Sequence, residues 1–495
     1  MLCTRGLLLV LFLSAEIAYW HIRWDSLVAT IALASGSEEA TGNSMHEYYL
    51  ELGNQHYENF RYEDAMTEYK NALVLEPEYL PAVMNLGNLY REIGLFSESI
   101  NELEKAYNIN PEYYKTSYNL GTTYYHMNDY AKAIEYYTNA LKLEPNHVNS
   151  HYNLAIIHQE TGQLMEALHG YRTALTIDPF HTESRLNYCN ILLAINDEQC
   201  ELCYKQVLSI DPNYVKGIIN LASYYQQQSP NGQVSTQALE LYQRAYELDK
   251  TNIMAVTALQ TLQRQQPTTS LDSRYITELF DSYSYIFETS LVANLNYQSH
   301  FHVVVAIEKY WEKKEKEEVI HMADLGAGTG LVCPLIKEKL NNLYIVGVDL
   351  SSKMLQQAKG KNCYDDLVVD DIDSYLTHRE PEPIKFDIIA ATDVFVYFGS
   401  LENALINARN RLKSNGIIVF TVEEFAGTDV SYTGTDITGT DVSFTLQTTG
   451  RFAHRKDYIE DVVNHLNFNL VALDKVVLRM DRGEPINGLL VACKI

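Results

Sequence analysis

Glycines and carboxylates in the second half of the chain are spaced so that they could bind a nucleoside. The run Asp324-Leu325-Gly326-Ala327-Gly328-Thr329-Gly330 follows an apolar stretch and leads into a helical pattern. Glycines at such a junction let the backbone turn sharply and approach a ligand without interference from a Cβ atom. Asp349, 19 residues past Gly330, is suited to accept hydrogen bonds from both hydroxyls of a ribose. Asp371 follows a third apolar stretch, where it could accept a hydrogen bond from an adenine amino group.

Five short apolar stretches must position these residues. They alternate with helical patterns, which is typical of a parallel, doubly wound sheet. Ligands bind such sheets at the carboxyl ends of the strands. The predicted strands are residues 320–325, 344–349, 367–369, 386–390 and 416–422.

The glycine spacing is a weak signal by itself, because GxGxG differs from the GxGxxG fingerprint of dinucleotide-binding proteins. With the two acids that follow it, however, the layout of residues 271–495 resembles that of the class I S-adenosylmethionine-dependent methyltransferases. The resemblance implies a Rossmann-like α/β domain with a doubly wound, mostly parallel, seven-stranded sheet, and S-adenosyl-L-methionine as cofactor. A nicotinamide enzyme and a degenerate domain are the alternatives.

The same resemblance implies roles for individual residues. The glycine loop faces the amino acid part of the cofactor, the acid that ends the second strand holds the ribose, and the acid after the third strand holds the adenine. The residues assigned to the cofactor are Asp324, Gly326, Ala327, Gly328, Gly330, Asp349, Leu350, Met354, Asp371, Asp393 and Tyr283. No metal site is expected.

A narrower resemblance is carried by the flanking sequence. The segments 279–287, 295–297, 393–399 and 450–454, and Arg479 with residues 483–488, are similar to those of a group of predicted methyltransferases that carry tetratricopeptide repeats ahead of the catalytic domain. This resemblance does not identify a methyl acceptor. The chain departs from the group in its N-terminal leader and in residues 427–444, where Gly-Thr-Asp recurs, so the shape of the acceptor site is open there.

Three rings are candidates for the neighbourhood of the reacting sulfonium. Methyl transfer is an in-line displacement in which orientation does much of the work, and a cation favours an aromatic site lined by carboxylates. We expect Tyr283 beside the cofactor, Tyr397 in a catalytic position and Phe287 on the acceptor side. Packing in an ordinary helix core is the alternative for each ring.

Two further side chains could act on the acceptor. His454 is a candidate general base, since an imidazole pKa of about 6.5 suits proton removal near neutrality. Arg451 could hold an acceptor carboxylate through two parallel hydrogen bonds. A structural histidine and a salt bridge to one of the domain's acids are the respective alternatives.

The first half of the chain repeats with a period of 34 residues. Leu52-Gly53 recurs as Leu86-Gly87 and Leu120-Gly121, and Pro77, Pro111, Pro145 and Pro179 keep the same step. This period is typical of the tetratricopeptide repeat. We predict six repeats and a capping helix over residues 45–264, then a linker at 265–270. The concave surface of such a solenoid would bind an extended peptide or a partner helix, and a spacer or a dimerisation module is the alternative.

Composition limits the partners and the compartment. Lys and Arg total 38 against 64 Asp and Glu, a net charge of −26 that disfavours nucleic acid as a partner. Seven cysteines form no disulfide framework, which favours a reducing compartment, and we expect the Cys200-Glu201-Leu202-Cys203 thiols to be structural. Residues 1–44 are a leader that is either signal-like or disordered. We expect a cytoplasmic protein, with membrane association through the leader as the alternative.

The sequence therefore predicts a methyltransferase whose repeats recruit or position a protein acceptor. One alternative is a methyltransferase for a small carboxylate metabolite that uses its repeats to oligomerise. The other is an interaction scaffold whose second domain binds the cofactor without catalysis.

Overall fold

The computed structural model describes ten stretches of the chain. They are residues 45–229, 233–263, 270–285, 287–288, 295–311, 318–377, 384–425, 443–447, 449–481 and 484–495. The leader at 1–44, most of the predicted linker and most of the 427–444 segment lie outside them. The chain divides into two compact units between Pro145 and Asn146. No helix among the described residues is long and apolar enough to cross a bilayer.

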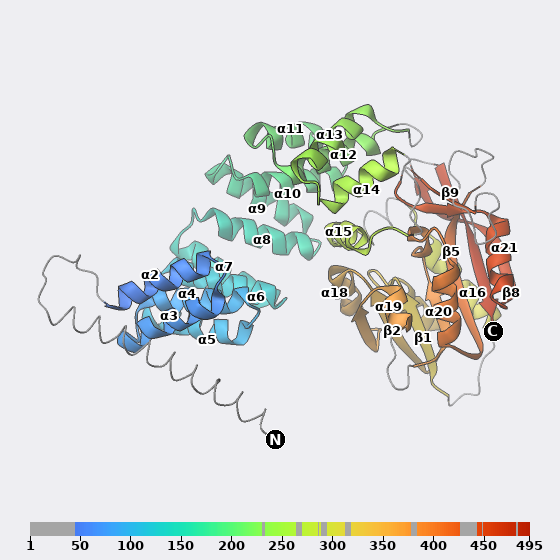
Figure 1. Cartoon of the computed structure of the whole chain (residues 1–495), viewed down its shortest axis with the longest axis horizontal. Coiled ribbons are helices and arrows are strands. Elements are labelled where there is room, and N and C mark those ends of the chain that lie inside the picture. Colours follow the sequence, from blue (N-terminus) through green and yellow to red (C-terminus); the bar gives the residue numbers. More distant parts are fainter. Residues whose placement is uncertain are drawn as a thin grey trace, which may run out of the picture. The chain divides into compact units, whose positions relative to one another are not determined.

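The first unit consists of antiparallel helix pairs, drawn from blue to cyan in Figure 1. Small residues let the two helices of a pair approach closely. A Cβ atom at Gly121 would lie 2.8 Å from the ring of Tyr137, which is fully buried. Gly53 faces Tyr69 in the same way. The helices are α2 (Met45–Glu58), α3 (Tyr62–Leu75), α4 (Leu80–Glu92), α5 (Phe96–Ile109), α6 (Tyr114–His126) and α7 (Tyr130–Leu143).

The second unit continues the helix pairs and then changes architecture. Its first helices are α8 (Val148–Glu160), α9 (Leu164–Ile177), α10 (Thr182–Ala194), α11 (Cys200–Ile210), α12 (Val215–Gln227), α13 (Thr236–Leu248) and α14 (Ile253–Leu262). The predicted helical solenoid is thus confirmed.

The cysteines of this region differ from the expectation. Cys203 forms a disulfide with Cys189, which joins α11 to α10, whereas Cys200 is a buried free thiol. A second disulfide joins Cys333 to Cys363. The expected pair of reduced thiols at 200 and 203 is therefore corrected, because helix packing brings Cys203 next to a cysteine 14 residues away.

A single mixed sheet organises the rest of the second unit. Five parallel strands lie in the order β3-β2-β1-β4-β5, with β9 antiparallel to β5 and β8 antiparallel to β9. These seven strands agree with the predicted fold. Two short strands are added at the carboxyl end of β5, where β7 pairs with β5 and β6 pairs with β7. Nine strands are therefore described. The strands are β1 (Ile320–Leu325), β2 (Leu343–Asp349), β3 (Asp366–Val369), β4 (Phe386–Ala391), β5 (Leu412–Glu424), β6 (Phe444–Leu446), β7 (Phe452–His454), β8 (Asn469–Asp481) and β9 (Glu484–Lys494).

Helices cover both faces of the sheet, since the central parallel strands are apolar on both sides. One apolar cluster packs α20 (Glu402–Arg411) and α21 (Lys456–His465) against the sheet. The other packs α16 (Ser299–Tyr310) and α17 (Val332–Lys339) on the opposite face. Figure 1 shows this arrangement in yellow to red. The remaining elements are α15 (Ser273–Tyr283), α18 (Ser352–Gly360), α19 (Ile372–Thr377) and a 3₁₀ turn, η3 (Phe395–Tyr397).

Candidate functional site

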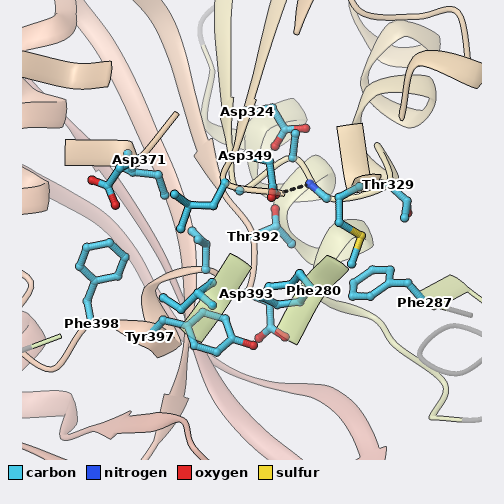
Figure 2. A pocket seen from close by; sticks show the side chains of 18 of the residues that line it. Phe280, Phe287, Asp324, Thr329, Asp349, Asp371, Thr392, Asp393, Tyr397 and Phe398 are labelled. Atoms are coloured by element: carbon cyan, nitrogen blue, oxygen red, sulfur yellow. Dashed lines mark hydrogen bonds between the residues drawn. The ribbon is translucent and has the colours of Figure 1, made fainter. Parts of the chain in front are cut away.

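A cavity of about 280 Å³ lies at the carboxyl ends of β1, β2 and β4. Figure 2 shows it from close by, with Asp324, Asp349 and Asp371 in the upper part of the view and Asp393 below them beside the rings of Tyr397 and Phe280. The residues predicted for the site that line it are Asp324, Gly326, Ala327, Gly328, Asp349, Leu350, Met354, Asp371, Asp393, Tyr397, Arg451 and Phe287. Gly330, Tyr283 and His454 are not among its lining residues.

The three glycines after β1 have different reasons to be glycine. All three have a positive φ, which L side chains rarely adopt. A Cβ at Gly326 would collide with Val394 at 2.6 Å, and one at Gly330 would collide with the ring of Tyr364 at 2.9 Å. Gly328 faces open space and lines the cavity. Gly330 therefore serves the packing of the loop, and Gly328 leaves room for a ligand.

Asp349 is held rigidly at the end of β2. Its two carboxylate oxygens accept hydrogen bonds from the backbone N–H groups of Gly328, at 2.8 Å, and Ser351, at 2.9 Å. Burial raises the pKa of Asp349 above its usual value, while these hydrogen bonds oppose the rise. Each oxygen retains a second lone pair, so the carboxylate can still accept two hydroxyl groups.

Asp371 stands at the start of α19. One oxygen accepts from the N–H groups of Asp373 and Ser374, and the other accepts from the hydroxyl of Ser273 at 3.2 Å. Ser273 begins α15, and this helix contributes Ile276 and Phe280 to the cavity wall. The hydrogen bond from Ser273 therefore joins α15, which forms part of the cavity wall, to Asp371.

Asp324 is fully buried beneath the glycine loop. Its Oδ2 atom accepts a hydrogen bond of 2.6 Å from the Tyr364 hydroxyl, and its Oδ1 atom has no partner. Burial raises the pKa of Asp324 to about 7, and the Tyr364 hydrogen bond lowers it. The ionisation of this carboxyl group is therefore poised near neutrality.

Asp393, Arg451 and Arg479, three of the residues that carry the resemblance to repeat-bearing methyltransferases, meet with Glu423 in one ion cluster. Arg451 Nη1 lies 3.0 Å from Asp393 Oδ2 and 3.4 Å from Glu423 Oε1. Arg479 Nη2 lies 2.7 Å from the same Glu423 oxygen, and its Nη1 lies 3.8 Å from Asp393 Oδ2. Two acids and two cations balance one another here. Arg451 forms the expected salt bridges to acids of the domain. It also lines the cavity, where it was expected to hold an acceptor carboxylate.

Aromatic rings form the wall beside this cluster. Phe280 makes edge contacts with Tyr397, at 5.6 Å between ring centroids, and with Phe287 at 6.2 Å. The Arg451 guanidinium lies 5.7 Å from the centre of the Tyr397 ring. Tyr297 stacks on His300 at 5.2 Å, and both line the cavity.

His454 and Tyr283 lie apart from the cavity. The imidazole of His454 is fully buried on β7, where its Nε2 bonds the carbonyl of Gly399 at 3.0 Å. Burial lowers the pKa of His454 to about 4. The His454 ring stacks on Tyr458 and lies beside Phe444, so it belongs to the apolar core of the domain. The Tyr283 hydroxyl accepts a hydrogen bond of 3.4 Å from Gln227 on α12.

The cavity also contains residues that the sequence did not single out. Thr329, Thr392 and His300 carry buried polar atoms without partners and line its wall. Thr329 belongs to the glycine run, and Thr392 directly precedes Asp393, so both could have been found by proximity to a motif. His300 lies on α16 and had no such signal.

Family models match two kinds of domain in this chain. A methyltransferase domain matches residues 323–418. Three tetratricopeptide repeat models match residues 80–113, 114–147 and 136–169. The chain is also 31% identical over 104 residues to malonyl-[acyl-carrier protein] O-methyltransferase of Priestia megaterium (strain DSM 319 / IMG 1521). The match covers 21% of this chain and 36% of that protein, so the chain spans about a third of the length of this relative.

Solved structures similar to the chain include two tetratricopeptide repeat proteins and MamA. YrrB, described as a TPR protein with an unusual peptide-binding site, is 19% identical, with 38% of this chain and 96% of YrrB covered and a TM-score of 0.30. A thermophilic TPR protein of Thermus thermophilus is 19% identical, with 36% and 97% covered and a TM-score of 0.31. MamA of Desulfovibrio magneticus RS-1 is 14% identical, with 35% and 98% covered and a TM-score of 0.32.

Proposed function

We propose that this chain, which joins tetratricopeptide repeats to a methyltransferase domain, transfers methyl groups from S-adenosylmethionine to a protein acceptor. One observation carries the proposal. The glycine loop, Asp349 and Asp371 converge on a single cavity at the carboxyl ends of neighbouring parallel strands. This is where an open α/β sheet binds its ligand.

The polar groups of the cavity fit this cofactor. Asp349 would hold the ribose hydroxyls, and Asp371 would accept from the adenine amino group, near Leu350 and Met354. Asp324 Oδ1, Thr329 Oγ1 and Thr392 Oγ1 are buried without partners on the cavity wall, and buried polar atoms of this kind normally find one. They suit the ammonium and carboxylate of the cofactor's amino acid part. When bound, the cofactor supplies a methyl group on a cationic sulfur.

The repeats support a protein as acceptor. Tetratricopeptide solenoids present extended surfaces to peptides and helices, and we propose that residues 45–264 form such a recruiting domain ahead of a catalytic domain at 271–495. The net charge of −26 disfavours nucleic acid. We propose a cytoplasmic location, because the cofactor is supplied there.

A second candidate is the methylation of a small carboxylate. It is favoured by the similarity to malonyl-[acyl-carrier protein] O-methyltransferase and by Arg451 in the cavity wall. In that case the repeats would serve oligomerisation.

Transfer from a methyl-labelled donor in a cell lysate separates the two candidates. The purified full chain is incubated with lysate and donor, and the products are separated by size. We expect label in protein. Label confined to low-molecular-weight material would select the carboxylate metabolite, and donor binding without any transfer would select a non-catalytic scaffold.

A further inference from the structure

One carboxylate oxygen of the ion cluster, Asp393 Oδ1, has no hydrogen-bond partner. Asp393 follows β4 with φ +57°, a left-handed backbone conformation that directs its side chain to the cavity wall. Its carboxylate is 7% exposed. The Oδ2 atom pairs with Arg451, whereas the Oδ1 atom is buried without a partner. Figure 2 shows Asp393 beside the aromatic wall, at the end of the cavity opposite Asp324. A buried carboxylate oxygen can only be satisfied by a hydrogen-bond donor.

The charged groups of the cavity wall favour a cationic ligand over an anionic one. Five carboxylates line it, namely Asp324, Asp349, Asp371, Asp373 and Asp393. Arg451 is the one Lys or Arg side chain among the lining residues, and it is already paired with Asp393 and Glu423. Burial lowers the pKa of His300 to about 4, so this imidazole is neutral near pH 7 and adds no cation. An anionic acceptor would therefore enter a site without a free cation among the described lining residues.

The rings at this end suit a cation. Tyr397 and Phe280 lie beside Asp393 in Figure 2, and Tyr297 and Phe287 line the same cavity. Aromatic faces attract ammonium groups, most strongly where water is excluded. The chain as a whole, at −26, also attracts cationic partners from a distance.

We propose that the methyl acceptor is a primary amine of the lysine type, whose N–H group donates to Asp393 Oδ1. This inference rests on the proposed methyltransferase function and names its acceptor. Asp393 would then bind the acceptor nitrogen rather than the cofactor.

The step balances with these groups alone. The ammonium first releases one proton to water. A remaining N–H bond donates to Asp393 Oδ1, which turns the nitrogen lone pair toward the methyl carbon. The lone pair forms the new C–N bond, while the electron pair of the C–S bond returns to sulfur. The product is a methylated ammonium and a neutral thioether. The rate should rise with pH as the amine loses its proton.

The test uses the full chain, a methyl-labelled donor, and two polymers of equal length as probes, poly-L-lysine and poly-L-glutamate. Wild-type protein should label poly-L-lysine with a label that survives alkali, as N-methyl groups do. Asp393→Asn should slow this transfer at least about tenfold, since it replaces a charged acceptor with a neutral amide oxygen and so loses the charge-assisted part of the hydrogen bond. Its affinity for the donor, measured by calorimetry, should stay within about twofold.

Glu423→Gln is the matched control. It removes one negative charge from the same cluster, but Glu423 does not line the cavity. We expect it to slow transfer much less than Asp393→Asn. Equal losses in the two variants would overturn the inference, because the effect would then belong to the cluster as a whole. Loss of donor binding in Asp393→Asn would overturn it too and return Asp393 to the cofactor.

A lysate arm covers acceptors that need a specific sequence. Proteins labelled by the wild-type chain are treated with alkali, which releases the label of carboxyl methyl esters as methanol. Retained label supports the amine. Released label, or labelling of poly-L-glutamate, overturns this inference while leaving the proposed methyltransferase intact. Failure of the wild-type chain to bind the donor would overturn both.

Discussion

At the scale of single residues, the buried carboxyl group of Asp324 beneath the glycine loop depends on one tyrosine. Asp324 and Asp349 lie at the carboxyl ends of predicted strands and Asp371 follows one, so their places at one sheet edge follow from the topology. Tyr364 reaches Asp324 from 40 residues away. Its ring occupies the space that side chains at Gly330 and Gly347 would need. No local sequence pattern predicts this contact, because it depends on how the segment before β3 packs beneath the glycine loop.

Removing the Tyr364 hydroxyl should change the pH dependence of donor binding. The pKa of Asp324 is raised to about 7, so its carboxylate is lost as the pH falls through that value. If the ionised form holds the cofactor's ammonium, affinity rises as the pH rises through about 7. Tyr364→Phe removes a hydrogen bond that favours ionisation, and the transition should move up by about one pH unit.

Calorimetric titration of donor binding between pH 6 and 9 checks this prediction, with thermal unfolding as the control for folding. A variant whose affinity follows the wild-type pH profile would show that the hydroxyl does not tune Asp324.

At the scale of elements, the repeat period and the strand alternation carried most of the fold. The 34-residue step fixes where helices pair, and strand β1 coincides with the predicted residues 320–325. Strands β8 and β9 were expected only through the resemblance to a seven-stranded sheet, and β6 and β7 were missed, because each has only three residues. The place of His454 depends on β7, so the same omission explains why this histidine resembled a catalytic base.

The short strand β7 makes His454 a stabilising residue with an acid-sensitive contribution. Its pKa is about 4 in the folded chain and about 6.5 when unfolded. The unfolded state therefore takes up the proton first, and stability is present above pH 6.5 and lost as the pH falls toward 4. At pH 5 this histidine should cost the wild type about 2 kcal/mol relative to pH 7.

Urea unfolding of His454→Phe checks this prediction. The variant should be less stable at pH 7 by ~1–3 kcal/mol, because Gly399 loses its donor. It should also lose less stability than the wild type between pH 7 and 5. Unchanged stability combined with abolished methyl transfer would instead make His454 a catalytic base.

Close helix pairing in the first unit depends on glycine. In Gly121→Ala the new Cβ atom would press on the buried Tyr137 ring at 2.8 Å. Overpacking costs ~1–3 kcal/mol, whereas alanine favours the helix over glycine by about 1 kcal/mol, so the cost of overpacking is the larger effect. We expect a net loss of about 1 kcal/mol in urea unfolding followed by helical circular dichroism.

Gly360→Ala is the control for this substitution, since Gly360 ends α18 with no atom within 4 Å of the added Cβ. It should change stability by no more than ~0.5 kcal/mol. Equal effects at the two glycines would mean that helix propensity, rather than the contact with Tyr137, governs the first unit.

At the scale of the whole molecule, charge and cysteine chemistry bear on where the chain works. The net charge of −26 could be read from composition, but the disulfides could not, since pairing depends on folded proximity. Cys189–Cys203 and Cys333–Cys363 use four of the seven cysteines, and Cys200 and Cys493 are free thiols, whereas Cys3 lies outside the described residues.

Thiol titration of the denatured, unreduced protein should therefore count three reactive groups. Protein treated with reductant before denaturation is the control and should give seven. A count of seven without reductant would contradict this expectation, because both pairs would then be reduced.

The central claim is that the cavity at the sheet edge binds S-adenosylmethionine, and calorimetric titration of the full chain tests it most directly. We expect S-adenosylmethionine and S-adenosylhomocysteine to bind and NADH not to bind. Asp349→Ala should abolish binding, because it removes the acceptor for the ribose and the anchor of Gly328. Asp365 accepts a hydrogen bond from the backbone N–H of Ile345 and does not line the cavity, so Asp365→Asn should retain binding. Binding of NADH, or undiminished affinity in Asp349→Ala, would contradict the account.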